Sequence, residues 1–156
     1  MTQASVMPAF RYRAFISYSH QDKSWANWLH KALEAYRVPR RLVGVTTTAG
    51  VVPVRLTPIF RDRDELPSAT DLNATVQEAL EHSACLIVIC SPHAARSRWV
   101  NEEIHAFKRL GRADRILCLI VGTRPAGEED ERELEHYFPP ALRYRVDADG
   151  APLASG

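Results

Sequence analysis

The sequence of 156 residues predicts an α/β fold, in which a flavodoxin-like, doubly wound sheet carries helices on both faces. We expect about five parallel strands. Two observations predict this class. Strand-like and helix-like patterns alternate along the chain, which is the order that produces parallel sheets. The runs 86–89 and 116–121 are apolar at every position, as is typical of strands covered on both faces.

The first half of the chain alternates strand and helix patterns. A strand at 13–17 is followed by the capping candidates Ser19 and Asp22 and then by a helix. The apolar residues of that helix recur at helical spacing: Trp25, Trp28, Leu29, Ala32, Leu33 and Tyr36. A second strand at 57–60 leads through the charged loop 61–69 into another helix. The apolar stripe of this second helix comprises Leu72, Val76, Ala79 and Leu80.

The second half repeats the alternation. A third strand at 85–90 precedes a helix that begins near Trp99, and a fourth strand spans 116–121. A short helix around 131–136 and a last strand at 143–146 complete the predicted fold.

The segment 38–55 does not fit a minimal version of this fold. Its Thr, Val, Pro and Gly content predicts a surface loop that can form a hairpin. We expect residues 1–11 to be a flexible lead, 12–147 to be the folded domain, and 148–156 to be a tail leading to further domains of a longer protein. A composition of 46% hydrophobic and 25% charged residues fits one domain with one core.

The charge balance argues against nucleic acid and membrane partners. The 20 Lys and Arg residues stand against 19 Asp and Glu residues, so a net charge of +1 creates no field that would attract polyanions. The N-terminus lacks a signal-peptide pattern, and no apolar run approaches the roughly 18 residues of a membrane helix. We therefore expect a cytoplasmic protein.

Neither the cysteines nor the histidines have metal-ligand spacing. Cys85, Cys90 and Cys118 fall inside apolar runs, and the odd separation of the first two places them on opposite faces of one strand. We expect reduced core thiols rather than a disulfide frame or a zinc site. The histidines expected at surface or helix-end positions, without a metal, are His82, His93, His105 and His136.

A tryptophan and a glutamate lie one helical turn apart after the third strand. Trp99 and Glu103 share one side of the predicted helix, whereas Glu102 points nearly the opposite way. The stripe expected to face the sheet comprises Val100, Ile104, Phe107 and Gly111. Glu103 lies at the edge of that stripe, where partial desolvation raises the pKa of a carboxylate. Such a pair can hold a planar base and act on its sugar; alternatively, Trp99 is a packing anchor and Glu103 a partly exposed helix residue.

Polar residues follow the first three strands, where carboxyl ends of parallel strands usually form the ligand-binding edge. The segments 17–22, 61–67 and 91–99 bring together hydroxyl, carboxylate, guanidinium, imidazole and aromatic groups. These groups suit a ligand with phosphates, a ribose and a base. A glycine-rich phosphate loop is absent from the sequence, so Arg side chains and helix N-termini would bind the phosphates. The imidazole of His20, beside the serines of its own loop, lacks the nucleophile elbow of a hydrolase triad.

Three segments together resemble Toll/interleukin-1 receptor (TIR) domains. Residues 12–19 with Asp22 resemble the first conserved box of that family, and residues 60–67 resemble its BB loop. Residues 97–103 match its S-x-W-x-x-x-E element. The resemblance spans about residues 12–146 and is to bacterial TIR modules of the NAD-cleaving kind, which commonly lie at the N-terminus of a larger protein.

The resemblance implies an NAD+ glycohydrolase or cyclase in which Glu103 occupies the position of the catalytic glutamate. Cleavage of the nicotinamide–ribose bond develops oxocarbenium character at the ribose, as in glycoside hydrolysis. One carboxylate is then enough, because nicotinamide leaves as a neutral molecule. Trp99 would stack on a base and favour cyclic ADP-ribose isomers over linear ADP-ribose. Neither a metal nor a cofactor is implied, since NAD+ is the substrate. The residues implied to shape the substrate cleft are Tyr18, Ser19, His20, Asp62 and Arg63.

The resemblance also implies self-association through the BB loop, residues 61–69, and a role in bacterial antiphage defence, a form of innate immunity, or in cell-death signalling. Two alternatives remain. The domain could be a non-enzymatic interaction module that recruits other TIR domains through its BB loop. A fold-level cousin, the nucleoside deoxyribosyltransferase type, would likewise use one carboxylate near a ribose. The presence of Glu103 and Trp99 favours the enzyme over the adaptor, which needs neither.

Overall fold

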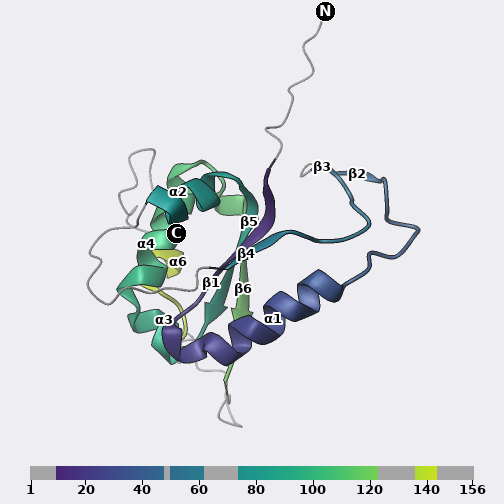
Figure 1. Cartoon of the computed structure of the whole chain (residues 1–156). Coiled ribbons are helices and arrows are strands. Elements are labelled where there is room, and N and C mark those ends of the chain that lie inside the picture. Colours follow the sequence, from purple (N-terminus) through teal and green to yellow (C-terminus); the bar gives the residue numbers. More distant parts are fainter. Residues whose placement is uncertain (1–9, 48–49, 62–73, 123–135, 144–156) are drawn as a thin grey trace, which may run out of the picture.

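The computed structural model describes residues 10–47, 50–61, 74–122 and 136–143 (Figure 1). The strands are β1 (Tyr12–Ser17), β2 (Thr46–Thr47), β3 (Gly50–Val51), β4 (Ile59–Arg61), β5 (Ser83–Cys90) and β6 (Ile116–Ile120). The helices are α1 (Lys23–Ala35), α2 (Ala74–Glu81), α3 (Pro92–Arg96), α4 (Arg98–Arg109) and α6 (Pro140–Arg143). Short 3-10 turns lie at His20–Asp22 and Ala113–Arg115.

Four of these strands form one sheet in the order β4-β1-β5-β6, and every neighbouring pair is parallel. Ala14 of β1 lies opposite both Ile59 and Cys85, so β1 runs through the interior of the sheet. These strands are the first four that the sequence predicts, and the α/β class is confirmed.

The two faces of the sheet carry separate sets of apolar residues because successive side chains of a strand point to opposite sides. Phe15, Leu86 and Val88 pack with α2, α4 and α6. Ile16 and Ile89 pack on the opposite face with α1. Figure 1 accordingly shows α1 on one side of the sheet and α2, α4 and α6 on the other. The predicted doubly wound arrangement is therefore present.

The first predicted helix exists, but its buried side differs from the prediction. Ala26 is fully buried, and Leu29 and Leu33 are partly buried against the sheet. Trp25 and Trp28 are 43% and 57% exposed and meet edge-on, with ring centroids 6.1 Å apart. The small side chain of Ala26 allows α1 to approach the sheet, which leaves both indoles at the rim of the contact.

The fourth predicted strand is not covered on both faces. β5 lies between two neighbours and is largely buried, but β6 is the edge of the described sheet. Leu117 is 57% exposed and Ile120 is 44% exposed. Its cysteine, Cys118, is exposed, so the prediction of a core thiol is wrong there. Cys85 and Cys90 pack on opposite faces of β5, as predicted, although Cys85 is only partly buried.

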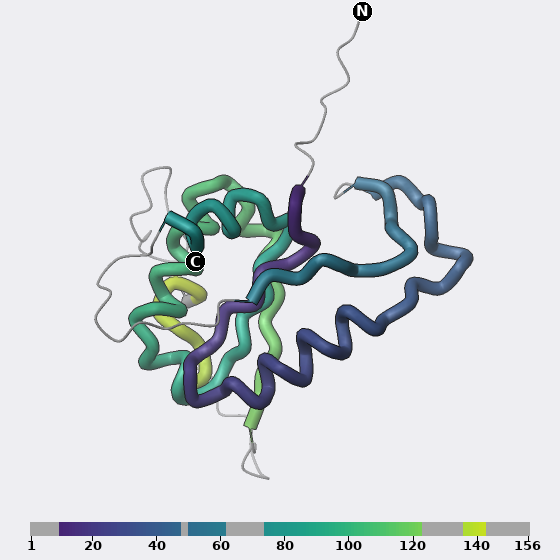
Figure 2. The backbone as a smooth tube through the Cα atoms, viewed as in Figure 1, coloured from purple at the N-terminus to yellow at the C-terminus, as the bar shows by residue number. Residues whose placement is uncertain are grey.

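The predicted insertion forms a hairpin. β2 and β3 pair antiparallel, and Thr47 Oγ1 donates to the carbonyl oxygen of Gly50 at 2.8 Å. Gly50 has a φ of +112°, a conformation that glycine adopts without steric cost. Figure 2 shows this hairpin extending away from the parallel sheet.

The last described helix, α6, is fixed to α4 at one residue. The backbone N–H of Ala141 donates to Asn101 Oδ1 at 2.8 Å, and Lys108 Nζ donates to the carbonyl oxygen of Ala141. Arg143 belongs to α6, so the prediction that a strand begins there is wrong. The remainder of that predicted strand, Leu72, and most of the predicted loop 61–69 and helix 131–136 lie outside the described residues.

Candidate functional site

The centre of the site is a buried carboxylate on α4. Ser97 caps this helix by accepting a hydrogen bond from the N–H of Val100 at 3.2 Å. The side chain of Glu103 is only 1% exposed. Ser17, which is fully buried at the end of β1, donates through Oγ to Glu103 Oε1 at 3.3 Å. A carboxylate so removed from water needs polar partners, and the hydroxyl of Ser17 is one of them.

The alternation of β1 explains why Ser17 meets this helix. Phe15 faces α4, and a residue two positions further along a strand faces the same way. Ser17 therefore lies under α4 at the carboxyl end of the strand. The sequence analysis did not assign Ser17 to the site, although this period of two was the signal that could have found it.

The predicted sheet-facing stripe of α4 is largely confirmed. Val100, Ile104 and Phe107 are fully buried against the sheet, whereas Gly111 is exposed beyond the end of the helix with a φ of +77°. Glu103 is buried more completely than the partial desolvation that was predicted, while Glu102 is partly buried. Glu103 faces the fully buried end of β1, where Ser17 lies against its carboxylate.

Trp99 is partly buried one turn before Glu103 and packs against the core beneath α4. Its Nε1 atom is buried and has no hydrogen-bond partner among the described residues. In the fold, the Trp99 ring packs against the core. The indole nitrogen is a donor at the edge of the site that the described protein groups do not use.

A second contact joins the loops that follow β1 and β5. Ser91 Oγ donates to Asp22 Oδ2 and accepts a hydrogen bond from the N–H of Ala94 at 3.0 Å, thereby capping α3. Asp22 is buried and occupies the N-cap position of α1, as predicted, but its side chain makes no capping hydrogen bond. The short helix α3 was not predicted, although Ser91 followed by Pro92 is a typical cap and first position.

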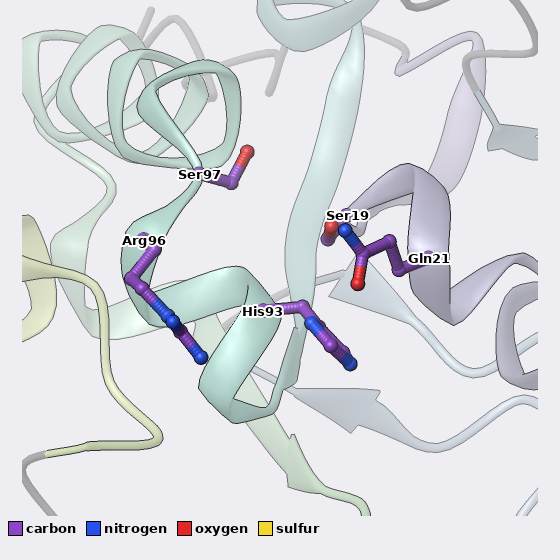
Figure 3. A pocket seen from close by; sticks show the side chains of 5 residues that line it. All are labelled: Ser19, Gln21, His93, Arg96 and Ser97. Atoms are coloured by element: carbon purple, nitrogen blue, oxygen red, sulfur yellow. The ribbon is translucent and has the colours of Figure 1, made fainter.

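A polar hollow of about 420 Å³ lies between these two loops (Figure 3). The described residues that line it are Ser19, Gln21, His93, Arg96 and Ser97. Figure 3 shows the first two on the turn that follows β1, opposite the three that come from α3 and the start of α4. The structure thus confirms that the segments after the first and third predicted strands converge.

Of the five residues predicted to shape the cleft, one lines the hollow, two do not, and two lie outside the described residues. Ser19 lines the hollow and is buried. Tyr18 packs into the core under α1, and His20 is exposed and does not line the hollow. Asp62 and Arg63 lie outside the described residues. Only the start of their loop is described; there, Arg61 lies opposite Ile16 of β1.

The thiols of Cys90 and Cys118 interact between β5 and β6. A hydrogen bond from Cys90 lowers the pKa of Cys118 to about 7, and the nearby charge of Lys108 acts in the same direction against the effect of burial. The same contact, together with burial, raises the pKa of Cys90. Burial raises the pKa of Cys85 as well. Cys118 is therefore the most acidic of the three thiols.

Two kinds of site are not found in the described part of the chain. Within it, no cluster of three or more His, Cys, Asp or Glu side chains is arranged to hold a metal ion. In the same residues, no helix has the length and apolar character needed to cross a membrane.

The fold and the site define an α/β domain with a buried glutamate and a polar hollow at the carboxyl edge of a parallel sheet. The chain belongs to the TIR domain family, since the model of that family matches residues 14–151.

Two known proteins illustrate the similarity. The NAD(+) hydrolase ApTIR of Actinoplanes sp. (strain ATCC 31044 / CBS 674.73 / SE50/110) is 34% identical over 139 residues. The match covers 85% of this chain and 18% of that protein, so the chain spans less than a fifth of the length of this curated relative. The TIR domains in the structure of the activated Roq1 resistosome directly recognizing the pathogen effector XopQ are similar with a TM-score of 0.48 and 18% identity. That match covers 74% of this chain and 60% of the other.

Proposed function

We propose that this TIR domain is an NAD+ glycohydrolase that cleaves the nicotinamide–ribose bond, with Glu103 as the catalytic residue. The observation that carries the proposal is the buried carboxylate of Glu103, held by Ser17 at the carboxyl edge of the sheet. The similarity to a protein named as an NAD(+) hydrolase supports the same activity.

The proposed reaction breaks the bond between C1′ of the ribose and the pyridinium nitrogen. The bonding electrons leave with nicotinamide, which departs neutral, and the ribose becomes an oxocarbenium-like cation. Water then adds to C1′ and releases a proton, which gives ADP-ribose. Attack by an adenine nitrogen instead gives a cyclic isomer.

The carboxylate of Glu103 would stabilise the charge that develops on the ribose. At about 4 Å and an effective dielectric constant of roughly 20, two unit charges attract by about 4 kcal/mol. Stabilisation of that size corresponds to about three powers of ten in rate. The carboxylate needs to give or take no proton in the bond-breaking step, and neither a metal nor a cofactor takes part in the proposed mechanism.

The remaining roles follow from position. Trp99 would stack on a base of the substrate and hold adenine near the reacting sugar, which favours the cyclic product. Ser19 would contact the substrate from the hollow, with Tyr18 and His20 beside it in the chain. Asp62 and Arg63 would contribute from the BB loop.

The wider context is part of the proposal. The segment 61–69 would join copies of the domain, and activity would depend on that assembly. We propose that the longer protein acts in the bacterial cytoplasm, in antiphage defence or cell-death signalling.

The experiment that tests the proposed function is chromatography of NAD+ after incubation with concentrated protein. Glu103→Gln preserves the shape of the side chain and its bond from Ser17, and removes the charge. We expect its rate to fall by a factor of about 10² to 10³, given the electrostatic term above. Glu102→Gln is the matched control, because it removes the adjacent, partly buried carboxylate, and it should retain the wild-type rate.

Three outcomes would count against this mechanism. Equal NAD+ consumption by wild type and Glu103→Gln would remove Glu103 from the chemistry. A similar fall in both variants would point to lost charge in general rather than to Glu103. No consumption by concentrated or clustered wild-type protein would leave a recruiting module as the function.

A further inference from the structure

The hollow at the start of α4, the helix that carries Glu103, has the chemistry of an anion site. Each of the five described residues that line it is polar, and no Asp or Glu is among those five. The acidic residue of the same turn, Asp22, is buried and accepts a hydrogen bond from Ser91. The described part of the lining therefore combines donors and one fixed positive charge, and it contributes no carboxylate that would repel an anion.

Arg96 supplies the fixed charge. Its Nε donates to the carbonyl oxygen of Pro92 at 3.2 Å, which orients the side chain along α3. Arg96 forms no ion pair with any of the described residues. Guanidinium groups bind phosphate oxygens through parallel N–H donors, and an arginine without a protein carboxylate is suited to that task.

Ser19 is an independent indication of a ligand. Ser19 as a residue is only 8% exposed, and its hydroxyl neither caps the following turn nor bonds to another described residue. Figure 3 shows this hydroxyl facing the hollow, with Gln21 on the same side and His93 opposite. A ligand in the hollow would therefore meet a hydroxyl that no described residue engages.

The distance from the hollow to Glu103 suits one substrate molecule. Ser97 at the hollow precedes Glu103 by six residues of α4, which is roughly 9 Å along a helix axis. Ser19 follows Ser17, the partner of Glu103, by two residues, which is at most about 7 Å of extended chain. A phosphate in the hollow would thus leave an attached ribose near the carboxylate.

We propose that this hollow binds the diphosphate of the dinucleotide substrate, with Arg96 as its principal charged contact. The inference rests on the proposed function, because it assigns a part of that substrate to a part of this surface. The subsite would select dinucleotides over nicotinamide riboside, which carries the same scissile bond and no phosphate.

The kinetic test compares Arg96→Gln with Arg98→Gln. Arg98 is an exposed arginine two residues away that does not line the hollow. We expect Arg96→Gln to raise the KM for NAD+ by about tenfold or more, the usual factor for one hydrogen bond to a charged group, with kcat within about twofold. Arg96→Lys should recover part of this loss, since it restores the charge without the planar fork. Arg96→Gln should cleave nicotinamide riboside at the wild-type rate. Arg98→Gln should keep the wild-type KM and kcat.

A binding test separates this inference from the proposed activity. Inorganic pyrophosphate is titrated into isotope-labelled wild-type protein, and backbone NMR signals of the hollow are followed. We expect the signals of Ser19, His93 and Ser97 to shift, and Arg96→Gln to weaken binding about tenfold relative to Arg98→Gln. Shifts that persist while NAD+ is not cleaved would support the anion site and refute the activity. Cleavage of NAD+ without these shifts, or equal effects of the two arginine variants, would overturn the diphosphate subsite and leave the activity standing.

Discussion

The side chains of Asp22 and Ser91 are hydrogen-bonded across the carboxyl ends of β1 and β5. Ser91 also caps α3, so one hydroxyl holds the turn before α1 and the helix that carries His93 and Arg96. The two sides of the hollow are therefore joined by a hydrogen bond between side chains 69 positions apart in the sequence.

Ser91→Ala should destabilise the domain. The helix cap contributes about 1 kcal/mol, and a hydrogen bond to a buried carboxylate contributes about 1.5–3 kcal/mol, which together give a loss of about 3 kcal/mol. Urea unfolding followed by circular dichroism measures the change. Ser24→Ala, at an exposed position of α1, is the control and should stay within about 0.5 kcal/mol of wild type. Equal stability of both variants would mean that the contact between Asp22 and Ser91 adds nothing.

Trp99→Ala should change the products as well as the rate. Loss of the indole removes the surface proposed to hold adenine close to the ribose, so the share of cyclic product should fall relative to linear ADP-ribose. Chromatography of the products over time measures the ratio. Trp28→Ala, which removes an exposed indole from α1, should leave the ratio unchanged. An unchanged ratio in Trp99→Ala would restrict Trp99 to packing.

Activity per mole of protein should rise with protein concentration. If the BB loop of one copy completes the site of the next, mass action makes the active fraction depend on assembly, and a hundredfold increase in concentration should raise specific activity by roughly tenfold. Initial rates over that range measure the effect. A rate strictly proportional to concentration would contradict dependence on assembly.

The thiol of Cys118 should be alkylated first. Its pKa is lowered to about 7, and the thiolate is the reactive form, so the rate with iodoacetamide should rise through pH 7 and level off above about pH 8. The raised pKa values of Cys85 and Cys90 predict slow labelling at neutral pH. Peptide mass spectrometry distinguishes the three sites.

Lys108→Gln tests one cause of this acidity. Removing the ammonium group should shift the pH profile of Cys118 labelling to higher pH, because the nearby positive charge favours the thiolate. Arg109→Gln, at an exposed position of the same helix, is the matched control. Should both variants label like wild type, the contact with Cys90 alone would account for the shift.

The elements with long periodic patterns could be predicted from the sequence. The four strands of the main sheet and the stripe of Val100, Ile104 and Phe107 follow from apolar spacing alone, and that spacing also directed attention to Glu103. Phase on a helix is a local property, so one segment is enough to predict it.

The features that the sequence did not reveal depend on which elements become neighbours. Ser17 and Glu103 are 86 residues apart; the strand period gives the face on which Ser17 lies, but it does not say which helix packs on that face. The exposure of Cys118 follows from the position of β6 at the edge of the described sheet, which an apolar run cannot disclose. The five residues of α3 are too few for a helical period to be recognised.

The hydrogen bonds that join Ala141 to Asn101 and Lys108 couple α6 mechanically to α4. These two side chains bind the backbone N–H and C=O of one residue of α6, from positions on either side of Glu103 in the sequence. Because a helix is a stiff rod of backbone hydrogen bonds, a pull on α6 would be transmitted to the carboxylate of Glu103 along α4 without first deforming the strands.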